Sequence, residues 1–168
     1  MSKLLTLISV LGLTVLMISC DKGIEPVEGK SAFSGKIVFK GGWLAGIKRT
    51  HLVVFKEPIR SVNDFSAANL SFVLDSIPYG TKEFSYNSSD MQFSPIFSIT
   101  PGSHKYIVVA QSKTPELTLI RADWTVVGVY CESGDQSKPK AMIINTGKTT
   151  ANVNITVDFN NPPPQPPM

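Results

Sequence analysis

The chain has 168 residues, of which 42% are hydrophobic, and it carries a formal net charge of +3. Its 16 Lys and Arg residues are scattered, without the basic run typical of a nucleic-acid-binding arm, so no nucleic-acid partner is expected. Removing residues 1–19 from the 168 leaves 149 residues. That length is enough for one domain whose core needs no disulfide.

The first 20 residues have the layout of a secretory signal. Lys3 supplies a positive charge, residues 4–18 are mostly apolar, and a small-residue cut site ends at Cys20. The apolar segment is shorter than the roughly 20 residues that a membrane-spanning helix needs. Because a cysteine stands at the cut site, with Met17 in place of the usual Leu, the segment resembles a bacterial lipoprotein signal. A plain signal followed by a coincidental cysteine is the alternative.

The resemblance implies that residues 1–19 are removed and that Cys20 carries the lipid. Two or more acyl chains anchor a protein stably to a bilayer without spanning it, so the expected partner is a membrane. The expected location is the bacterial cell envelope, with the outer membrane favoured over the inner membrane. Residues 20–30 are polar and contain Gly and Pro, which predicts a tether between the lipid and the domain.

From residue 31 onward, short strands are predicted almost everywhere by apolar–polar alternation or by short apolar runs. The expected strands are residues 33–39, 51–56, 70–74, 84–86, 93–99, 106–110, 124–131, 141–144 and 151–159. Residues 51–56 are apolar on both faces, as a central strand is, and residues 106–110 form a continuous apolar strand. The only helix expected is a turn or two within residues 59–68. The pattern predicts an all-β fold, an antiparallel β-sandwich over residues 31–160.

The segment Phe97-Ser98-Ile99-Thr100-Pro101-Gly102-Ser103-His104-Lys105-Tyr106-Ile107-Val108-Val109-Ala110 resembles the signature hairpin of transthyretin-like (prealbumin-like) sandwiches. These include carboxypeptidase regulatory-like domains and Cna B-type modules. Residues 34–39 are similar to their first strand and residues 152–159 to their last. The chain departs from the pattern at His104, where an aromatic residue is usual. The resemblance implies a Greek-key sandwich and a role as a stalk, spacer or ligand-binding accessory.

Residues 161–168 form a Pro-rich tail that cannot join a strand ladder through its prolines. A polyproline II conformation is expected there. The tail could be a ligand for a partner domain, but a frayed end is the more common arrangement.

No catalytic or metal-binding constellation stands out in the sequence. A hydrolytic triad needs a histidine base, and only His51 and His104 are present, each expected to lie at the surface. Closely spaced His and Cys ligands for zinc are missing, so neither a metal nor a cofactor is expected. Cys131 ends an apolar run and is expected to be buried and inert. These observations predict that the chain is not an enzyme.

Aromatic residues are the remaining candidates for ligand contact. Trp43, Tyr79, Tyr86 and Trp124 could stack against sugar rings, although core packing is the commoner use of such residues. Trp43 is expected to be the most exposed of the four. The sequence therefore favours a lipid-anchored, non-catalytic structural or binding module of the envelope. The alternative is a carbohydrate-binding accessory lipoprotein, with a glycan or an envelope protein as its partner.

Overall fold

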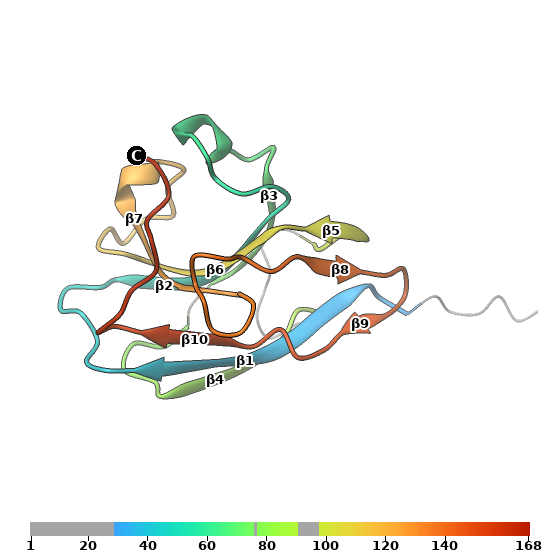
Figure 1. The fold of residues 1–168 in the computed structure, drawn as a ribbon, viewed down its shortest axis with the longest axis horizontal. Helices are drawn as coiled ribbons and strands as arrows, with labels where there is room; N and C mark the ends of the chain where they lie inside the picture. Colours follow the sequence, from blue (N-terminus) through green and yellow to red (C-terminus); the bar gives the residue numbers. More distant parts are fainter. Residues whose placement is uncertain (1–28, 76, 91–97) are drawn as a thin grey trace, which may run out of the picture.

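The computed structural model describes residues 29–75, 77–90 and 98–168, which fold almost entirely as β-structure (Figure 1). The all-β class predicted from the sequence is confirmed. The predicted signal, Cys20 and most of the tether lie outside the described residues. The elements are β1 (Ala32–Lys40), β2 (Arg49–Phe55), the 3-10 turn η1 (Val62–Asp64), β3 (Leu70–Leu74), β4 (Glu83–Asn87), β5 (Gly102–His104), β6 (Tyr106–Ser112), the 3-10 turn η3 (Arg121–Asp123), β7 (Trp124–Val129), β8 (Met142–Ile144), β9 (Thr149–Thr150) and β10 (Ile155–Asp158).

The first sheet is built around β1 and has the order β10-β1-β4, with β9 also pairing with β1. β4 runs antiparallel to β1, whereas β9 and β10 run parallel to it. The parallel pairs correct the expectation of a wholly antiparallel sandwich. Strands β1 and β10 come from opposite ends of the domain, so no hairpin turn dictates that they run in opposite directions.

The second sheet has the order β3-β2-β6-β7, and all of its neighbouring strands are antiparallel. Every residue of β6 is buried, as is every residue of β2 except Arg49. The central strand predicted at residues 51–56 is confirmed as β2, which ends at Phe55, and the apolar strand predicted at residues 106–110 is confirmed as part of β6, the other central strand. Strands β5 and β8 form a separate two-stranded antiparallel ribbon.

The main core lies between the two sheets. Its rings meet edge to face, with the centroids of Phe33 and Phe72 5.1 Å apart. Gly128 of β7 faces β10 so closely that an added Cβ would lie 2.7 Å from Cγ2 of Val157. The glycine thus permits the two sheets to approach at this point. The core consists of Phe33, Ile37, Phe39, Leu52, Val54, Phe72, Leu74, Ile77, Tyr86, Ile99, Ile107, Val109, Val127, Met142, Ile144, Val153, Ile155 and Val157.

Three expected elements differ from the structure. The strand expected at residues 151–159 is shorter, Ile155–Asp158, because Asn152 has a positive φ of 63° that interrupts the extended backbone. The helix expected within residues 59–68 is only the single 3-10 turn Val62–Asp64. The strand expected at residues 93–99 falls mostly outside the described residues.

Candidate functional site: an apolar pocket on the outer face of the second sheet

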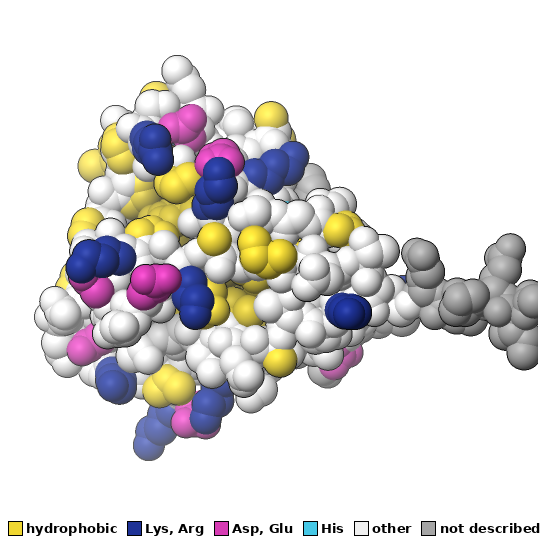
Figure 2. All heavy atoms as spheres, turned by 45° about the vertical axis from the view of Figure 1, so that its right-hand side comes forward, with side chains coloured by type: hydrophobic (Ala, Val, Ile, Leu, Met, Phe, Trp, Pro, Cys, Tyr) yellow, Lys and Arg dark blue, Asp and Glu magenta, His cyan; other side chains and the backbone are white. Residues whose placement is uncertain are grey.

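An apolar pocket of about 280 Å³ lies on the face of the second sheet that points away from the main core. Its floor is formed by apolar side chains from four strands. They are Val53, Phe55, Val73, Val108, Ala110 and Val126. Hydrophobic side chains gather on one part of the surface in Figure 2, between charged side chains at its rim. A pocket of this size and character is typical of small-molecule sites, although it lies near the lower end of their volume range.

The pocket exists because the second sheet is apolar on both faces while the first sheet covers only one of them. The uncovered face carries its own cluster of buried residues, which includes Val53, Tyr106 and Trp124. Two loops, residues 56–69 and 113–123, fold over this face and leave the pocket between them and the sheet. The loops contribute Ile59, Phe65, Leu117 and Leu119 to its walls.

The first loop is held in shape by the 3-10 turn η1. Backbone N–H groups of Arg60 and Ser61 donate to Oδ2 of Asp64, at 2.9 and 2.8 Å. These hydrogen bonds lower the pKa of Asp64 below its usual range. At the far end of the loop, Asn69 Nδ2 donates to the carbonyls of Glu57 and Asp64. These hydrogen bonds fix the conformation of the loop, and with it the positions of Ile59 and Phe65 in the pocket wall.

The second loop is fastened to the edge strand β7. Trp124 Nε1 donates to the carbonyl of Thr118 at 3.0 Å, and Thr118 Oγ1 donates to Asp123 at 2.7 Å. Three apolar side chains of this loop remain exposed beside the pocket, a costly arrangement for a surface without an apolar partner. These are Leu117, Leu119 and Ile120, which are 45%, 58% and 60% exposed.

The same loop places a buried arginine in the pocket wall. Arg121 is 4% exposed and lines the pocket. Its Nη1 donates to the carbonyl of Trp124, and its Nη2 donates to the carbonyl of Pro166 at 2.9 Å. Burial lowers the pKa of Arg121 below its usual range, an effect that the neighbouring Tyr106 partly opposes. Sequence reasoning did not single out this residue.

The C-terminal tail is packed along β7, which corrects the expectation of a frayed end. Figure 1 shows the tail running past β7 toward η3. The Gln165 side chain makes both hydrogen bonds that a neighbouring strand would make to Val126: its Oε1 accepts from the N–H at 2.9 Å, and its Nε2 donates to the C=O at 2.7 Å. Pro163 and Pro166 are buried. A side-chain amide thus replaces the backbone donors that prolines lack.

His51 is fully buried in the pocket floor, so the surface role expected for it is wrong. Its ring packs edge to face against Trp124, with the centroids 5.0 Å apart. Its Nδ1 lies 3.2 Å from Asp75, whose carboxylate also pairs with Arg49 at 3.0 Å. Burial lowers the pKa of His51, and the charge of Arg49 adds to this effect, against opposing contributions from Asp75 and the Leu74 carbonyl.

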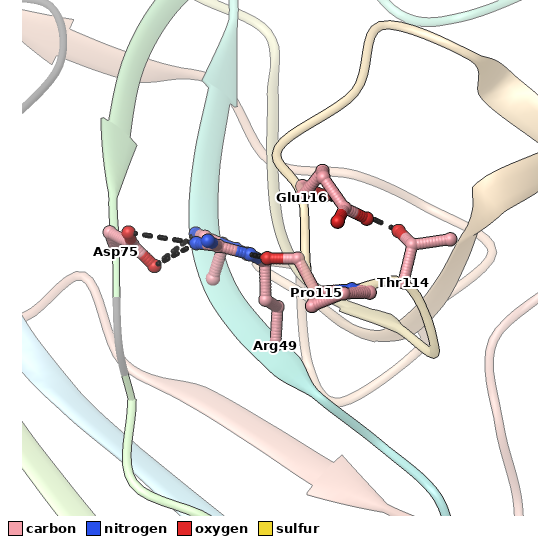
Figure 3. Close-up of polar contacts among 6 residues, drawn as sticks. Arg49, Asp75, Thr114, Pro115 and Glu116 are labelled. Carbon is pink, nitrogen blue, oxygen red and sulfur yellow. Dashed lines mark hydrogen bonds and ion pairs between the residues drawn. The ribbon is translucent and has the colours of Figure 1, made fainter.

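Figure 3 shows Arg49 extending between Asp75 and the backbone of Pro115, to which its Nε donates. This ion pair borders a more polar groove of about 400 Å³. The groove is lined by Lys48, Arg49, Thr50, Asp75, Ile77, Pro78, Tyr79 and Pro115. Among the described residues, the Asp75 carboxylate is the charged group that faces the His51 ring, at 3.2 Å from Nδ1.

The four aromatic residues considered as candidates for ligand contact do not form one platform. Trp43 and Tyr79 are neighbours, with centroids 5.1 Å apart, and Tyr79 is 59% exposed. Trp43 is only partly exposed, because it packs on Phe39 and Phe159 and donates from Nε1 to the Thr81 carbonyl. Tyr79, not Trp43, is therefore the more exposed of this pair.

Tyr86 and Trp124 are buried, at 4% and 7% exposure, which agrees with core packing as the commoner use of such residues. Tyr86 faces the main core and donates its hydroxyl proton to the Val153 carbonyl. Burial raises its pKa well above the usual range. Trp124 lies instead on the opposite face of the second sheet, where it lines the apolar pocket.

Two further expectations change with the structure. His104 is 2% exposed, not at the surface: its Nε2 donates to the Thr100 carbonyl at 2.9 Å, which leaves Nδ1 to accept from Ser71 at 3.1 Å. Cys131 is only partly buried, because it stands just beyond the end of β7. Desolvation nevertheless raises the pKa of its thiol, which keeps it protonated.

No protein-family model, curated protein or solved structure matches this chain. In the part of the chain that the structure describes, no helix has the length and apolarity needed to cross a bilayer. Over the same residues, no three His, Cys, Asp or Glu side chains are grouped as metal ligands would be. The pocket on the second sheet is thus the feature that best defines a site.

Proposed function

We propose that the chain is a lipid-anchored, non-catalytic binding module of the bacterial cell envelope that holds a small apolar ligand. The observation that carries this proposal is the apolar pocket of about 280 Å³ with exposed Leu117, Leu119 and Ile120 beside it. Burying apolar surface is the main favourable contribution to binding in such sites, and each buried methylene contributes about 0.8 kcal/mol.

The sequence of the first 20 residues supports anchoring through Cys20. Lys3, the apolar residues 4–18 and the cysteine at the cut site have the lipoprotein arrangement. The tether at residues 20–30 then links the lipid to β1, which starts at Ala32. We place the anchor in the outer membrane in preference to the inner membrane. The sequence resemblance of residues 34–39, 97–110 and 152–159 to transthyretin-like sandwiches supports the further proposal of a prealbumin-like fold.

A non-catalytic role is favoured by the surroundings of the two histidines. His51 is enclosed by Trp124, Asp75 and the floor of the pocket, and its pKa is lowered by burial. His104 is occupied on both ring nitrogens by Ser71 and Thr100. A general base needs a hydrogen bond to the proton that it removes, and neither ring presents a free nitrogen to solvent.

The experiment that tests the pocket is the uptake of an apolar dye by the full chain carrying Cys20→Ser, which removes lipid as a competitor. N-phenyl-1-naphthylamine becomes fluorescent in apolar sites, and we expect saturable binding. Ala110→Phe fills the floor of the pocket, and Leu119→Ser makes its wall polar; each should weaken binding about tenfold or more, since a loss of about 1.4 kcal/mol is a factor of ten. Ile143→Ser is the matched control, because Ile143 is 51% exposed and does not line the pocket. Equal dye binding by all four proteins, each shown to be folded by circular dichroism, would overturn the proposal.

A carbohydrate-binding accessory is the second candidate, and one observation favours it. Tyr79 is exposed beside the polar groove that Arg49 and Asp75 line, so a sugar ring could stack on the phenol and hydrogen-bond to the charged pair. Affinity electrophoresis in polysaccharide gels tests this directly. Retardation that is lost in Tyr79→Ala, and weakened in Trp43→Ala, would support a glycan site; no retardation in any common polymer would count against it.

A further inference from the structure

Arg121 is a buried cation that pairs with no carboxylate in the part of the chain that the structure describes. Its side chain is 4% exposed, and its hydrogen bonds go to the neutral carbonyls of Trp124 and Pro166. Nε has no hydrogen-bond partner, and no ion pair involves Arg121 among the described residues. Burying a charge without a counter-ion is costly, and a guanidinium in such a place is usually paired.

Arg121 is one of the residues that line the pocket. The guanidinium has five N–H donors, of which the Trp124 and Pro166 carbonyls occupy two. A carboxylate binds a guanidinium through two parallel hydrogen bonds. The edge of the guanidinium that carries Nε–H and one Nη–H can donate both of them. Because Arg121 lines a pocket that is otherwise almost wholly apolar, such a carboxylate would have to belong to an occupant of the pocket.

The other charged groups near the pocket limit the charge of this occupant. Arg49 already pairs with Asp75 at 3.0 Å, which satisfies the charge next to His51. Burial holds the pKa of His51 below its usual range, so its ring adds no positive charge near neutral pH. Among the residues that line the pocket, Arg121 is therefore the cation that can balance a negative charge on a ligand. A doubly charged phosphate would keep one negative charge without a counter-ion in an apolar site.

The volume limits the size of the apolar part. A cavity of roughly 150 Å³ with apolar walls accommodates a benzene ring. The pocket here, at about 280 Å³, has nearly twice that space. We propose that the pocket binds a monocarboxylate with an apolar body of about a dozen carbon atoms, such as a medium-chain fatty acid, whose carboxylate pairs with the Arg121 guanidinium. This inference rests on the proposed function, since it names the class of ligand for the same pocket.

The test uses decanoate and 1-decanol, which have the same chain length and differ in the carboxylate. The protein is the full chain with Cys20→Ser and Trp43→Phe, which leaves Trp124 as its one tryptophan. Because Trp124 lines the pocket, its emission reports occupancy there. Decanoate should change Trp124 emission saturably and bind about tenfold or more tightly than 1-decanol, as expected for a hydrogen-bonded charge pair.

Variants then assign the head group. Arg121→Gln should reduce decanoate affinity about tenfold or more and leave decanol affinity nearly unchanged. Arg60→Gln is the matched control, because Arg60 is exposed and lies outside the pocket lining. Should Arg121→Gln fail to fold, the comparison of decanoate with decanol on the parent protein still decides the question. Equal affinities for the two ligands would overturn the carboxylate assignment and leave the apolar pocket standing. No response of Trp124 to either ligand would overturn both proposals.

Discussion

The packing of the C-terminal tail on β7 predicts that one glutamine side chain stabilises the whole domain. Gln165 Oε1 accepts from the Val126 N–H at 2.9 Å, and its Nε2 donates to the Val126 C=O at 2.7 Å. Val126 itself is 4% exposed. Gln165→Ala removes both hydrogen bonds and leaves the two backbone groups of an almost buried residue without partners.

The expected loss follows from these contacts. A typical intramolecular hydrogen bond contributes about 1 kcal/mol net, so the pair should contribute about 2 kcal/mol. Gln165 is itself largely exposed, and water can reach part of the vacated site, which reduces the loss to about 1–2 kcal/mol. For a domain of this size, each kcal/mol lowers the melting temperature by about 2–4 °C.

Urea unfolding of the full chain carrying Cys20→Ser measures the effect. Gln165→Glu keeps an acceptor for the Val126 N–H but turns an oxygen toward the Val126 C=O, so it should not restore stability. Met168→Ala is the control, since Met168 is 82% exposed. A chain ending at Asn161 should lose more than Gln165→Ala, because it also loses the buried Pro163 and Pro166. The reasoning fails if both Gln165→Ala and the shortened chain stay within about 0.5 kcal/mol of the parent.

Three further outcomes are expected. Gly35→Ala should destabilise by about 3 kcal/mol or more in urea unfolding, because a Cβ there would lie 2.1 Å from the Val153 carbonyl oxygen; Gly42→Ala, with nothing within 4 Å, should be neutral. Burial lowers the pKa of His51, so the unfolded state binds a proton more readily than the folded state. The free energy of unfolding should therefore be unaffected above about pH 6.5 and should fall by up to about 1.4 kcal/mol per pH unit below it. In His51→Gln, urea unfolding should show a smaller decrease in stability per pH unit than in the parent. Cys20→Ser should move the protein from the membrane fraction to the soluble fraction, and persistence in the membrane fraction would refute the lipid anchor.

The strands could be predicted because their signal is local. Alternation within seven to nine residues marks β1, and the continuous apolar run of β2 indicates burial on both faces. The same reasoning missed the parallel pairing of β1 with β10, since the direction of two strands far apart in sequence leaves no local trace. It also placed His51 at the surface, although that residue begins a stretch whose neighbours are all buried.

The sequence contains an indication of the pocket, which is the apolar character of both faces of β2. If a strand is apolar on both faces and belongs to a two-layer sandwich, its second face needs a third layer. Val53 and Phe55 form part of that second face, and only loops remained in the sequence to cover it. Arg121 could not have been found in this way. Its burial depends on Pro166, 45 residues later in the chain, and a proline-rich end is usually solvated.

The tail and the pocket share one guanidinium, and this links the stability of the fold to its binding site. Arg121 donates one proton to the Pro166 carbonyl of the tail, while its Nε lacks a partner. A carboxylate in the pocket would hold the guanidinium in the orientation that the tail also requires. By thermodynamic linkage, whatever stabilises this orientation for the ligand stabilises it equally for the tail. The proline-rich segment therefore contacts the binding site through Arg121, and a ligand held by this guanidinium should also stabilise the packing of the tail.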